Sequence, residues 1–160
     1  MNRTVKYIFL LIFFLTSNLY AEKDYLNIDA KKFESNEKKN FIHFKGDVIM
    51  SKNNDTLKCQ DLMISTKKNS KKQIPKKYKA KGNVTFTITL KDKILKGGGD
   101  TVFYYPDEQK YIITGNGYLE DTKTDKKLFA SKIYIDEKTG LTKIDGEKNK
   151  PVKFRLKLGN

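Results

Sequence analysis

The sequence has few of the residues that catalytic and metal sites use most. Its 160 residues include one cysteine, Cys59, one histidine, His43, and no tryptophan. A lone cysteine cannot form an internal disulfide, and we expect Cys59 to be a small buried side chain. A lone histidine excludes a histidine-rich metal site, and the sequence offers no recognisable setting for a Ser-His-Asp triad. We therefore expect no enzymatic activity, no metal and no cofactor.

His43 and the glycines also lack the context of a functional motif. Ile42 and Phe44 flank His43 and point toward the expected core, which places the histidine on the outer surface of its strand. Gly97-Gly98-Gly99 is expected between two strands rather than before a helix, and no glycine has the spacing of a nucleotide-binding loop. Carboxylate pairs such as Glu120-Asp121 fall in expected turns, where solvated charge is the usual explanation.

The N-terminus has the layout of a secretory signal. Arg3 and Lys6 precede the apolar residues 7–15, and a more polar stretch ends at Ala21. This order predicts cleavage after Ala21, because the apolar run is too short for a membrane-spanning helix of roughly 20 residues. Leu19 departs from the small residue preferred before the cleavage site, so retention of residues 1–21 as an anchor is the alternative. We expect a signal peptide over 1–21 and one domain over 22–160.

Acidic residues are too few to balance the basic ones. The chain has 33 Lys and Arg against 19 Asp and Glu, a net charge of +14, and removal of residues 1–21 leaves +12. Such a charge favours an anionic partner, although a lysine-rich composition with interspersed acidic residues is an alternative explanation. Nucleic acid is not the expected partner, because we expect the chain to be exported and its aromatic residues are scattered over both faces of the expected strands.

Alternation of apolar and polar residues with a period of two dominates the chain from Tyr25 onward. It is clearest over 83–90, where Val84, Phe86, Ile88 and Leu90 oppose threonines, and over 151–158, where Val152, Phe154, Leu156 and Leu158 oppose basic residues. Polar turns at 52–55, 106–108, 122–125 and 137–140 separate the strands. Outside the signal segment no stretch carries a sustained helical stripe, so the fold is predicted to be all-β.

The chain also repeats itself. Gly46, Gly82, Gly115 and Gly146 recur at spacings of 36, 33 and 31 residues, and a second element recurs at 28–30, 59–62, 99–102 and 130–133. Periods in this range indicate stacked units, here pairs of short antiparallel strands. A glycine bend in each unit would fold the strands into two facing sheets, as an open-edged sandwich or roll. The lysine-rich residues 67–79 depart from the repeat and are expected to form a mobile loop.

The alternation predicts which side chains face the interior. Parity counted from the repeat glycines selects Phe44, Val48, Met50, Ala80, Val84, Phe86, Ile88, Ile113 and Leu119, and the second element adds Leu26, Ile28, Leu62, Ile64, Val102, Tyr104, Ile133 and Ile135. In an ordinary sandwich these residues form a sealed core. The functional alternative is that the two sheets do not seal and leave a slot that holds acyl chains.

Three segments carry a resemblance to a known family: Phe44-Lys45-Gly46-Asp47-Val48, Lys81-Gly82-Asn83-Val84, and Leu119 within 114–119. In their order along residues 24–158 they resemble the OstA-like family of lipopolysaccharide-transport proteins, which includes LptA. The resemblance implies a twisted β-jellyroll, open along one edge, with lipid A acyl chains between its sheets. It further implies that Leu26, Ile28, Phe86, Val102 and Tyr104 contact lipid, and that Lys67 occupies a loop position where a basic residue can meet a lipid phosphate.

The resemblance also implies partners and a compartment. Members of the family act in the periplasm, stack head to tail, and bridge an LptC-like inner-membrane protein to an LptD-like outer-membrane protein. We expect Val152, Phe154 and Leu156 to lie on an unpaired edge strand that pairs with the first strand, near 25–28, of the next protomer. The alternatives are a membrane-anchored LptC-like component of the same system and a structural envelope protein with a sealed core.

Overall fold

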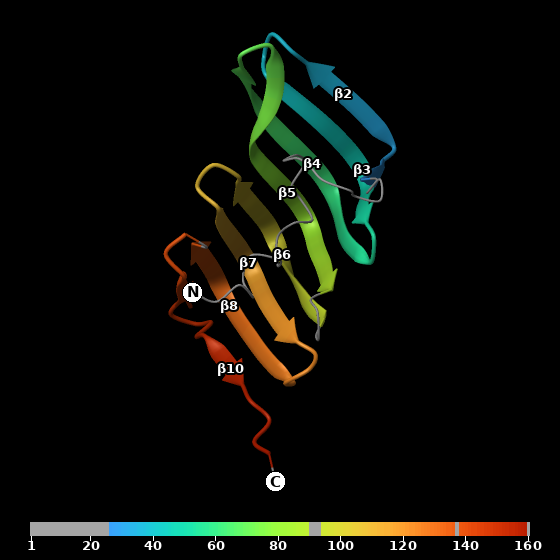
Figure 1. Cartoon of the computed structure of the whole chain (residues 1–160). Helices are drawn as coiled ribbons and strands as arrows, with labels where there is room; N and C mark the ends of the chain where they lie inside the picture. The colour runs from blue at the N-terminus through green and yellow to red at the C-terminus, as the bar shows by residue number, and fades with distance from the viewer. Residues whose placement is uncertain (1–25, 90–93, 137, 160) are drawn as a thin grey trace, which may run out of the picture.

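The computed structural model describes residues 26–89, 94–136 and 138–159, which form ten β-strands (Figure 1). The strands are β1 (Asn27–Asp29), β2 (Lys32–Asn36), β3 (Phe41–Lys52), β4 (Asp55–Asn69), β5 (Lys72–Thr89), β6 (Ile94–Tyr105), β7 (Lys110–Asp121), β8 (Lys126–Asp136), β9 (Leu141–Asp145) and β10 (Lys153–Arg155). From β3 to β8 each strand pairs antiparallel with the next along the chain. Figure 1 shows the sheet running from blue β2 at one end to red β10 at the other. The all-β prediction is confirmed.

The predicted signal segment, residues 1–21, lies outside the described residues. Within the described part of the chain, no helix is long and apolar enough to cross a membrane. The turns predicted at 52–55, 106–108 and 122–125 are confirmed, since each separates two paired strands.

At each end of the sheet, two short strands occupy the place of one long strand. β1 pairs with residues 49–51 of β3, and β2 pairs with residues 41–45 of the same strand. At the other end, β9 pairs with residues 132–136 of β8, and β10 pairs with residues 127–129. Between β1 and β2, the Lys31 N–H donates to the Gly46 carbonyl over 3.0 Å, so the interruption lies at the level of the repeat glycine.

The repeat glycines bend the long strands. The strand register shifts after Lys45 in β3, after Lys81 in β5 and after Thr114 in β7. At these shifts the glycine and the residue after it both have left-handed φ: Gly46 (80°) and Asp47 (47°), Gly82 (86°) and Asn83 (48°), Gly115 (74°) and Asn116 (49°). Glycine tolerates this conformation without steric cost, and Asp and Asn tolerate it better than other side chains. The predicted bends are confirmed at these three positions.

The bends fold the sheet over so that its two halves face each other. Val48 and Met50 on one side of the bends, and Ile113 and Ile133 on the other, are at most 1% exposed and belong to one apolar cluster. Since these side chains from both sides of the bends share one cluster, and the described residues form no helix, the two halves of the sheet bury each other's apolar faces. Layer 1 comprises β2, β9 and residues 41–45, 61–69, 72–81, 101–105, 110–114 and 132–136; layer 2 comprises β1, β10 and residues 48–52, 55–58, 84–89, 94–98, 117–121 and 126–130.

The prediction of a mobile loop over 67–79 is wrong. β4 continues to Asn69 and β5 begins at Lys72, so only Ser70 and Lys71 form the turn, and Ser70 has a φ of 53°. The lysines do not prevent pairing, because long side chains project from an exposed strand while the backbone bonds to its neighbour. Pro75 lies next to a register shift between Ser65 and Thr66, and such irregularities are places where a strand tolerates proline.

Gly97-Gly98-Gly99 lies inside β6, and its prediction as a connection between strands is also wrong. The absence of side chains there makes room for neighbours on both faces. A Cβ on Gly97 would lie 2.6 Å from Cε2 of Phe86, and one on Gly98 would collide with the Val84 carbonyl oxygen and lie 3.0 Å from Cε1 of Tyr118. These glycines therefore mark close approach of neighbouring groups within a strand.

The strand predicted over 151–158 is much shorter than expected. β10 spans Lys153–Arg155, and Val152, Phe154, Leu156 and Leu158 are 39%, 60%, 46% and 84% exposed. No other described strand pairs with the outer side of β10, so most of this segment has no neighbour against which its alternating apolar side chains could pack.

Candidate lipid-binding site

The fourteen residues predicted to line a lipid-binding interior all lie in one apolar cluster between the two layers. Ten of them are buried, with exposures of 7% or less: Val48, Met50, Leu62, Ile64, Val84, Phe86, Ile88, Val102, Tyr104 and Ile133. Leu26, Ile28, Phe44 and Ile135 are partly buried and pack against these ten. The alternation therefore identified a set of side chains that the fold brings together.

The apolar interior reaches both ends of the sandwich. At the β1–β3 end, Ile28 and Phe44 are partly buried, and the ring of Phe33, which is 63% exposed, lies 5.2 Å from that of Phe44 between centroids. At the β8–β9 end, Ile135 and Ile144 are also partly buried. The interior is thus covered in its middle strands and partly open to solvent where the sheet stops.

Among the described residues, the chain connects the two layers on one side only. In the described part of the chain, every backbone passage between the layers lies at the level of the bends. The hairpin turns lie on the opposite side, in two rims, one for each layer. Lys67 forms an ion pair with Asp107 along the rim of layer 1, and the Thr89 N–H donates to Asp55 over 2.6 Å along the rim of layer 2. This side can therefore part without breaking the hydrogen bonds of the sheet.

A ladder of three tyrosines lies next to the rim of layer 1. Tyr78, Tyr104 and Tyr111 are in register on β5, β6 and β7, and Tyr104 and Tyr111 are stacked with ring centroids 4.2 Å apart. The three rings are at most 5% exposed, and burial raises the pKa of Tyr78 well above its usual value. Only Tyr104 was predicted. Tyr78 fell in the supposed loop, whereas Tyr111 has the same parity as Ile113 and could have been found from it.

Other interior residues were missed because the parity of the buried side chains changes within β4 and β8. In β4 the buried side chains have odd numbers before the bend, Leu57 and Cys59, and even numbers after it, Leu62 and Ile64. In β8 they change from even numbers, Leu128 and Ala130, to an odd one, Ile133. A count that starts from one half of such a strand assigns the other half to the wrong face. Cys59 is 4% exposed, as predicted, and burial raises the pKa of its thiol to about 11, so the thiol is not activated as a nucleophile.

His43 is on the predicted face of its strand, but it is not on the surface. Its neighbours pair with interior residues of β4, Ile42 with Ile64 and Phe44 with Leu62, so His43 points away from the interior. The side chain is nevertheless buried, 8% exposed, and its Nε2 lies 2.8 Å from Oδ1 of Asp61. β2 pairs along this part of β3, with Glu34 opposite His43, and the sequence pattern did not reveal the burial of the ring.

The remaining predicted site residues lie outside the interior. Lys67 belongs to β4 rather than to a loop, and its ammonium group is paired with Asp107. Val152, Phe154 and Leu156 are exposed at the C-terminal end, where no other described strand continues the sheet. In the described residues no group of three or more His, Cys, Asp or Glu side chains could hold a metal ion.

Comparison with known proteins identifies the family. Residues 27–141 match the family described as LptA/(LptD N-terminal domain) LPS transport protein, whereas no curated protein matches the chain. The crystal structure of LptH from Pseudomonas aeruginosa, the LptA homologous periplasmic component of the conserved lipopolysaccharide transport device, matches with a TM-score of 0.69 and 12% identity, over 85% of this chain and 97% of that one. That likeness confirms the predicted jellyroll fold. By its sequence match, the chain belongs to the LptA/(LptD N-terminal domain) LPS transport protein family.

Proposed function

We propose that the protein is a periplasmic carrier of lipopolysaccharide and that its interior shelters the acyl chains of lipid A. The observation that supports this most is the apolar cluster that runs between the layers and stays partly exposed at both ends. Each buried CH₂ group contributes roughly 0.8 kcal/mol, so a lipid with several long chains needs a continuous apolar environment to cross an aqueous compartment.

In this proposal the acyl chains enter along the side where the two rims meet. Interior residues such as Met50 and Tyr104 are almost fully buried against their neighbours, so the layers have to part before lipid is admitted. Parting leaves the sheet hydrogen bonds intact, and the contacts with hydrocarbon replace the side-chain contacts that are lost. The protein receives lipid that another component delivers, since its sequence has no nucleotide-binding loop and we expect no enzymatic activity.

The carrier would bridge the two membranes by adding strands at its ends. β1 and β2 form one edge of the sheet, and β9 and β10 form the other. Edge strands offer backbone groups to another chain, and the exposed Phe154 and Leu156 add apolar surface at the C-terminal end. We propose head-to-tail contacts between copies, with an LptC-like protein at one end of the series and an LptD-like protein at the other.

Photo-crosslinking tests the lipid site. A benzophenone amino acid at Phe86 or Tyr104, both buried in the interior, should form adducts with lipopolysaccharide in cells. The control is the same amino acid at Thr87, which neighbours Phe86 on β5 and points to the opposite face. Equal adducts at all three positions, or none at Phe86 and Tyr104 in a correctly exported protein, would leave a structural envelope protein with a sealed core as the better explanation.

Truncation tests the bridge. Removal of residues 151–160 takes away β10 and the apolar residues around it, so light scattering should detect a smaller average mass at the same protein concentration. Replacement of Lys148 and Lys138 by glutamine alters exposed residues outside the β10 edge and serves as a control that should leave the mass unchanged. Persistence of the full oligomers in the truncated protein would refute the role of this edge. N-terminal sequencing of the exported protein separates a cleaved carrier from an anchored LptC-like form.

A further inference from the structure

Positive charge is concentrated in the hairpin that joins β4 to β5. Residues 66–77, the lysine hairpin, contain six lysines and no acidic residue. The nearest acidic residues along the chain are Asp61 and Asp92, whereas acidic and basic residues are interspersed over most of the sequence. The lysine hairpin thus carries +6 of the chain's net charge of +14.

The lysine hairpin projects from the sandwich. Residues 66–69 and 72–75 pair with each other, whereas the neighbouring strands β3 and β6 pair only as far as Ser65 and Tyr78. Figure 1 shows the hairpin in green, beyond the ends of β6 and β7. It belongs to the rim of layer 1, on the side opposite the bends. The side chains at its tip are therefore accessible to a large partner.

Contacts on both sides hold the lysine hairpin in place. The Thr66 N–H donates to the Asn40 carbonyl over 2.9 Å, and the Gln73 side-chain amide donates to the Asn40 side chain over 3.2 Å. Toward β6 and β7, Lys67 forms an ion pair with Asp107. The hairpin is thus an ordered extension of the sheet, and the backbone that carries its charges is fixed.

Most of the charge in the lysine hairpin is not neutralised by the protein. Asp107 pairs with Lys67, whereas four other lysines are exposed and form no ion pair with another described residue: Lys68, Lys71, Lys72 and Lys76. Like charges held this close together repel one another, so an opposite charge brought to the hairpin relieves the repulsion. The tip therefore favours an anionic partner.

The basic surface continues onto the outer face of layer 1. The Lys77 ammonium lies over the rings of Phe103 and Tyr105, 5.6 and 6.0 Å from their centroids. The Lys79 ammonium lies 5.7 Å from the centroid of Phe103. These cation–π contacts hold both ammonium groups on the outer face, so the rings support positive charge rather than offer a free surface to a sugar or a base.

Two features indicate that the partner is a surface rather than a peptide strand. Pro75 lacks an N–H group, and Lys76 is an extra residue at a register shift between β4 and β5, so this edge of β5 is a poor template for another strand. The lysine hairpin also contains no arginine, the residue best suited to paired hydrogen bonds with one carboxylate or phosphate. Lysines act as hydrated point charges and suit a surface on which anionic groups are spread.

We propose that the lysine hairpin docks the protein on the anionic phospholipid surface of a membrane. Each basic side chain near such a surface strengthens binding by about fivefold, so four unpaired lysines on one projecting hairpin act together. The inference goes beyond the proposed function and does not require it, because phospholipid head groups supply the charge. Docking would turn the side on which the two rims meet toward the membrane.

Flotation with vesicles tests the docking. The protein purified after export should float with vesicles of equal parts phosphatidylglycerol and phosphatidylcholine, and it should not float with phosphatidylcholine alone. Binding should be lost in about 1 M salt, where the screening length falls to about 3 Å. Equal binding to both kinds of vesicle, binding that salt does not weaken, or no binding to either would overturn the inference.

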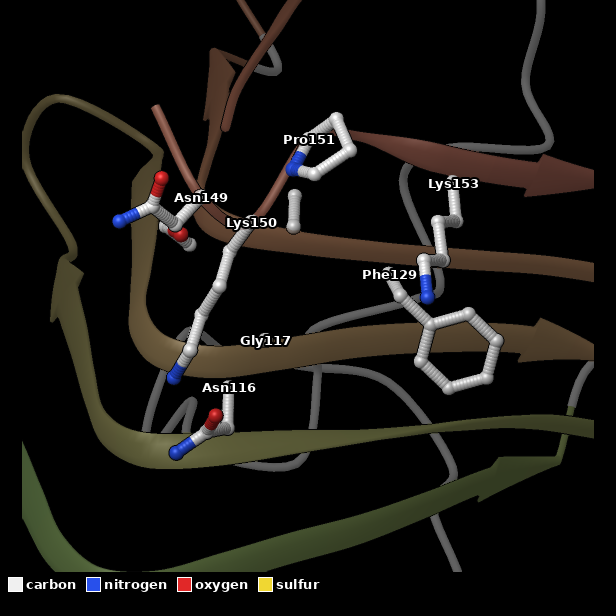
Figure 2. Close-up of a pocket in the computed structure, with 9 residues that line it drawn as sticks. Asn116, Gly117, Phe129, Asn149, Lys150, Pro151 and Lys153 are labelled. Carbon is white, nitrogen blue, oxygen red and sulfur yellow. The ribbon is translucent and has the colours of Figure 1, made fainter. Parts of the chain in front are cut away.

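Matched variants locate the docking surface. K68Q/K71Q/K72Q/K76Q should bind anionic vesicles at least about a hundredfold more weakly, because each lysine contributes about fivefold. The control, K58Q/K96Q/K148Q/K150Q, makes the same charge change at exposed residues outside the lysine hairpin and should lose much less. Figure 2 shows Lys150 of this control set in the cleft beside the bends, extending across Gly117. Equal losses in the two variants would overturn the inference.

A fluorescent label reports the contact while the other charges stay in place. Lys71 lies in the turn of the lysine hairpin, so a polarity-sensitive dye on Lys71→Cys should shift its emission to shorter wavelength when anionic vesicles are added. The same dye on Lys148→Cys should not respond, and the native Cys59, 4% exposed, is protected from labelling. The same shift at both positions, or none at Lys71→Cys, would contradict docking through the hairpin.

Two results separate this inference from its alternatives. Binding of the native protein to polyglutamate but not to anionic vesicles would assign the lysine hairpin to an acidic protein and overturn the membrane contact. Crosslinking of lipopolysaccharide at Phe86 tests the carrier independently, because the vesicles contain no lipopolysaccharide. Adducts at Phe86 without vesicle binding would refute this inference alone, and vesicle binding without adducts would refute the proposed carrier alone.

Discussion

Gly97 in β6 lies under the ring of Phe86, and replacing it by alanine tests whether the interior is packed as the structure has it. The two residues are opposite each other in the pairing of β5 with β6, and Gly97 is also opposite Leu119 on β7. A Cβ at position 97 would lie 2.6 Å from Cε2 of Phe86 and 2.9 Å from Cδ2 of Leu119. Carbon atoms in contact are about 3.5–4.0 Å apart, and Cζ of Phe86 is nearer still than Cε2, so the ring has to move by more than about 1 Å.

The expected cost follows from two opposing effects. Overpacking of a well-packed core costs about 1–3 kcal/mol, and Phe86, which is 5% exposed, has little room to move. Alanine is preferred to glycine in a strand by about 0.5–1 kcal/mol, which offsets part of that cost. We therefore expect Gly97→Ala to lower the free energy of unfolding by about 1.5 kcal/mol. In a Phe86→Leu background the outer ring atoms are absent, and Gly97→Ala should be neutral or slightly stabilising.

Urea unfolding followed by circular dichroism on the four proteins of this double-mutant cycle measures the coupling. The expected coupling energy is about 1–2 kcal/mol, and its sign makes the double variant more stable than the sum of the single changes predicts. Gly159→Ala serves as the control, because a Cβ there meets no atom within 4 Å, and it should change stability by less than about 0.5 kcal/mol. The same loss from Gly97→Ala in both backgrounds, or no loss in either, would refute the packing between Phe86 and Gly97.

Two other changes test the burial and the bends. Burial raises the pKa of the Cys59 thiol from 9.0 to about 11 and also raises that of Tyr78, so both groups ionise more readily in the unfolded chain. These groups should thus not affect the free energy of unfolding below about pH 9, and they should lower it as the pH rises toward 11. The fall should be less steep in Cys59→Ala. Urea unfolding at several pH values would measure both. Gly82→Ala places a Cβ 2.8 Å from that of Gln60, at a φ of 86° that alanine rarely adopts. It should lower the free energy of unfolding by about 1–3 kcal/mol, and calorimetry should detect a lower melting temperature. An unchanged melting temperature would contradict the bend geometry.

The interior was largely predictable because the bends preserve parity in half of the long strands. β3, β5 and β7 each gain one residue relative to their partners at the Gly-Asp or Gly-Asn pair, so Val48 and Met50 keep the parity of Phe44, and Val84 keeps that of Ala80. The partner strands gain no residue, and their buried positions change parity across the bend. Counting from the glycines therefore succeeds in the first kind of strand and fails for Leu57 and Leu128 in the second.

Other errors came from composition that conflicts with backbone pairing. The lysines of residues 67–79 and the triple glycine of β6 are unusual in strands, yet residues 67–69, 72–75 and 77 pair within the β4–β5 hairpin, and Gly97 and Gly98 pair with neighbours on both sides. The tertiary context decides whether such residues can lie in a strand: the lysines project into solvent, and Gly97 accommodates the Phe86 ring. At the C-terminus the reverse holds, because residues 151–158 have the alternation of a strand but only three of them pair. A pattern predicts that a segment can form a strand, while a neighbour determines that it does.

The ends of the sandwich differ from its middle because the repeat is interrupted there. Ala30-Lys31 contains no bend glycine, and Gly146-Glu147 lacks the left-handed pair found at the earlier bends, so each end has two short strands instead of one bent strand. A strand added by another molecule at either end would extend the sheet and cover partly exposed interior residues such as Phe44 and Ile144. Covering them contributes about 25 cal/mol per Å² of apolar surface. If copies stack as proposed, the added strand would bury apolar surface at the same place where it lengthens the apolar interior. Assembly and the proposed path of the lipid would then depend on the same contacts.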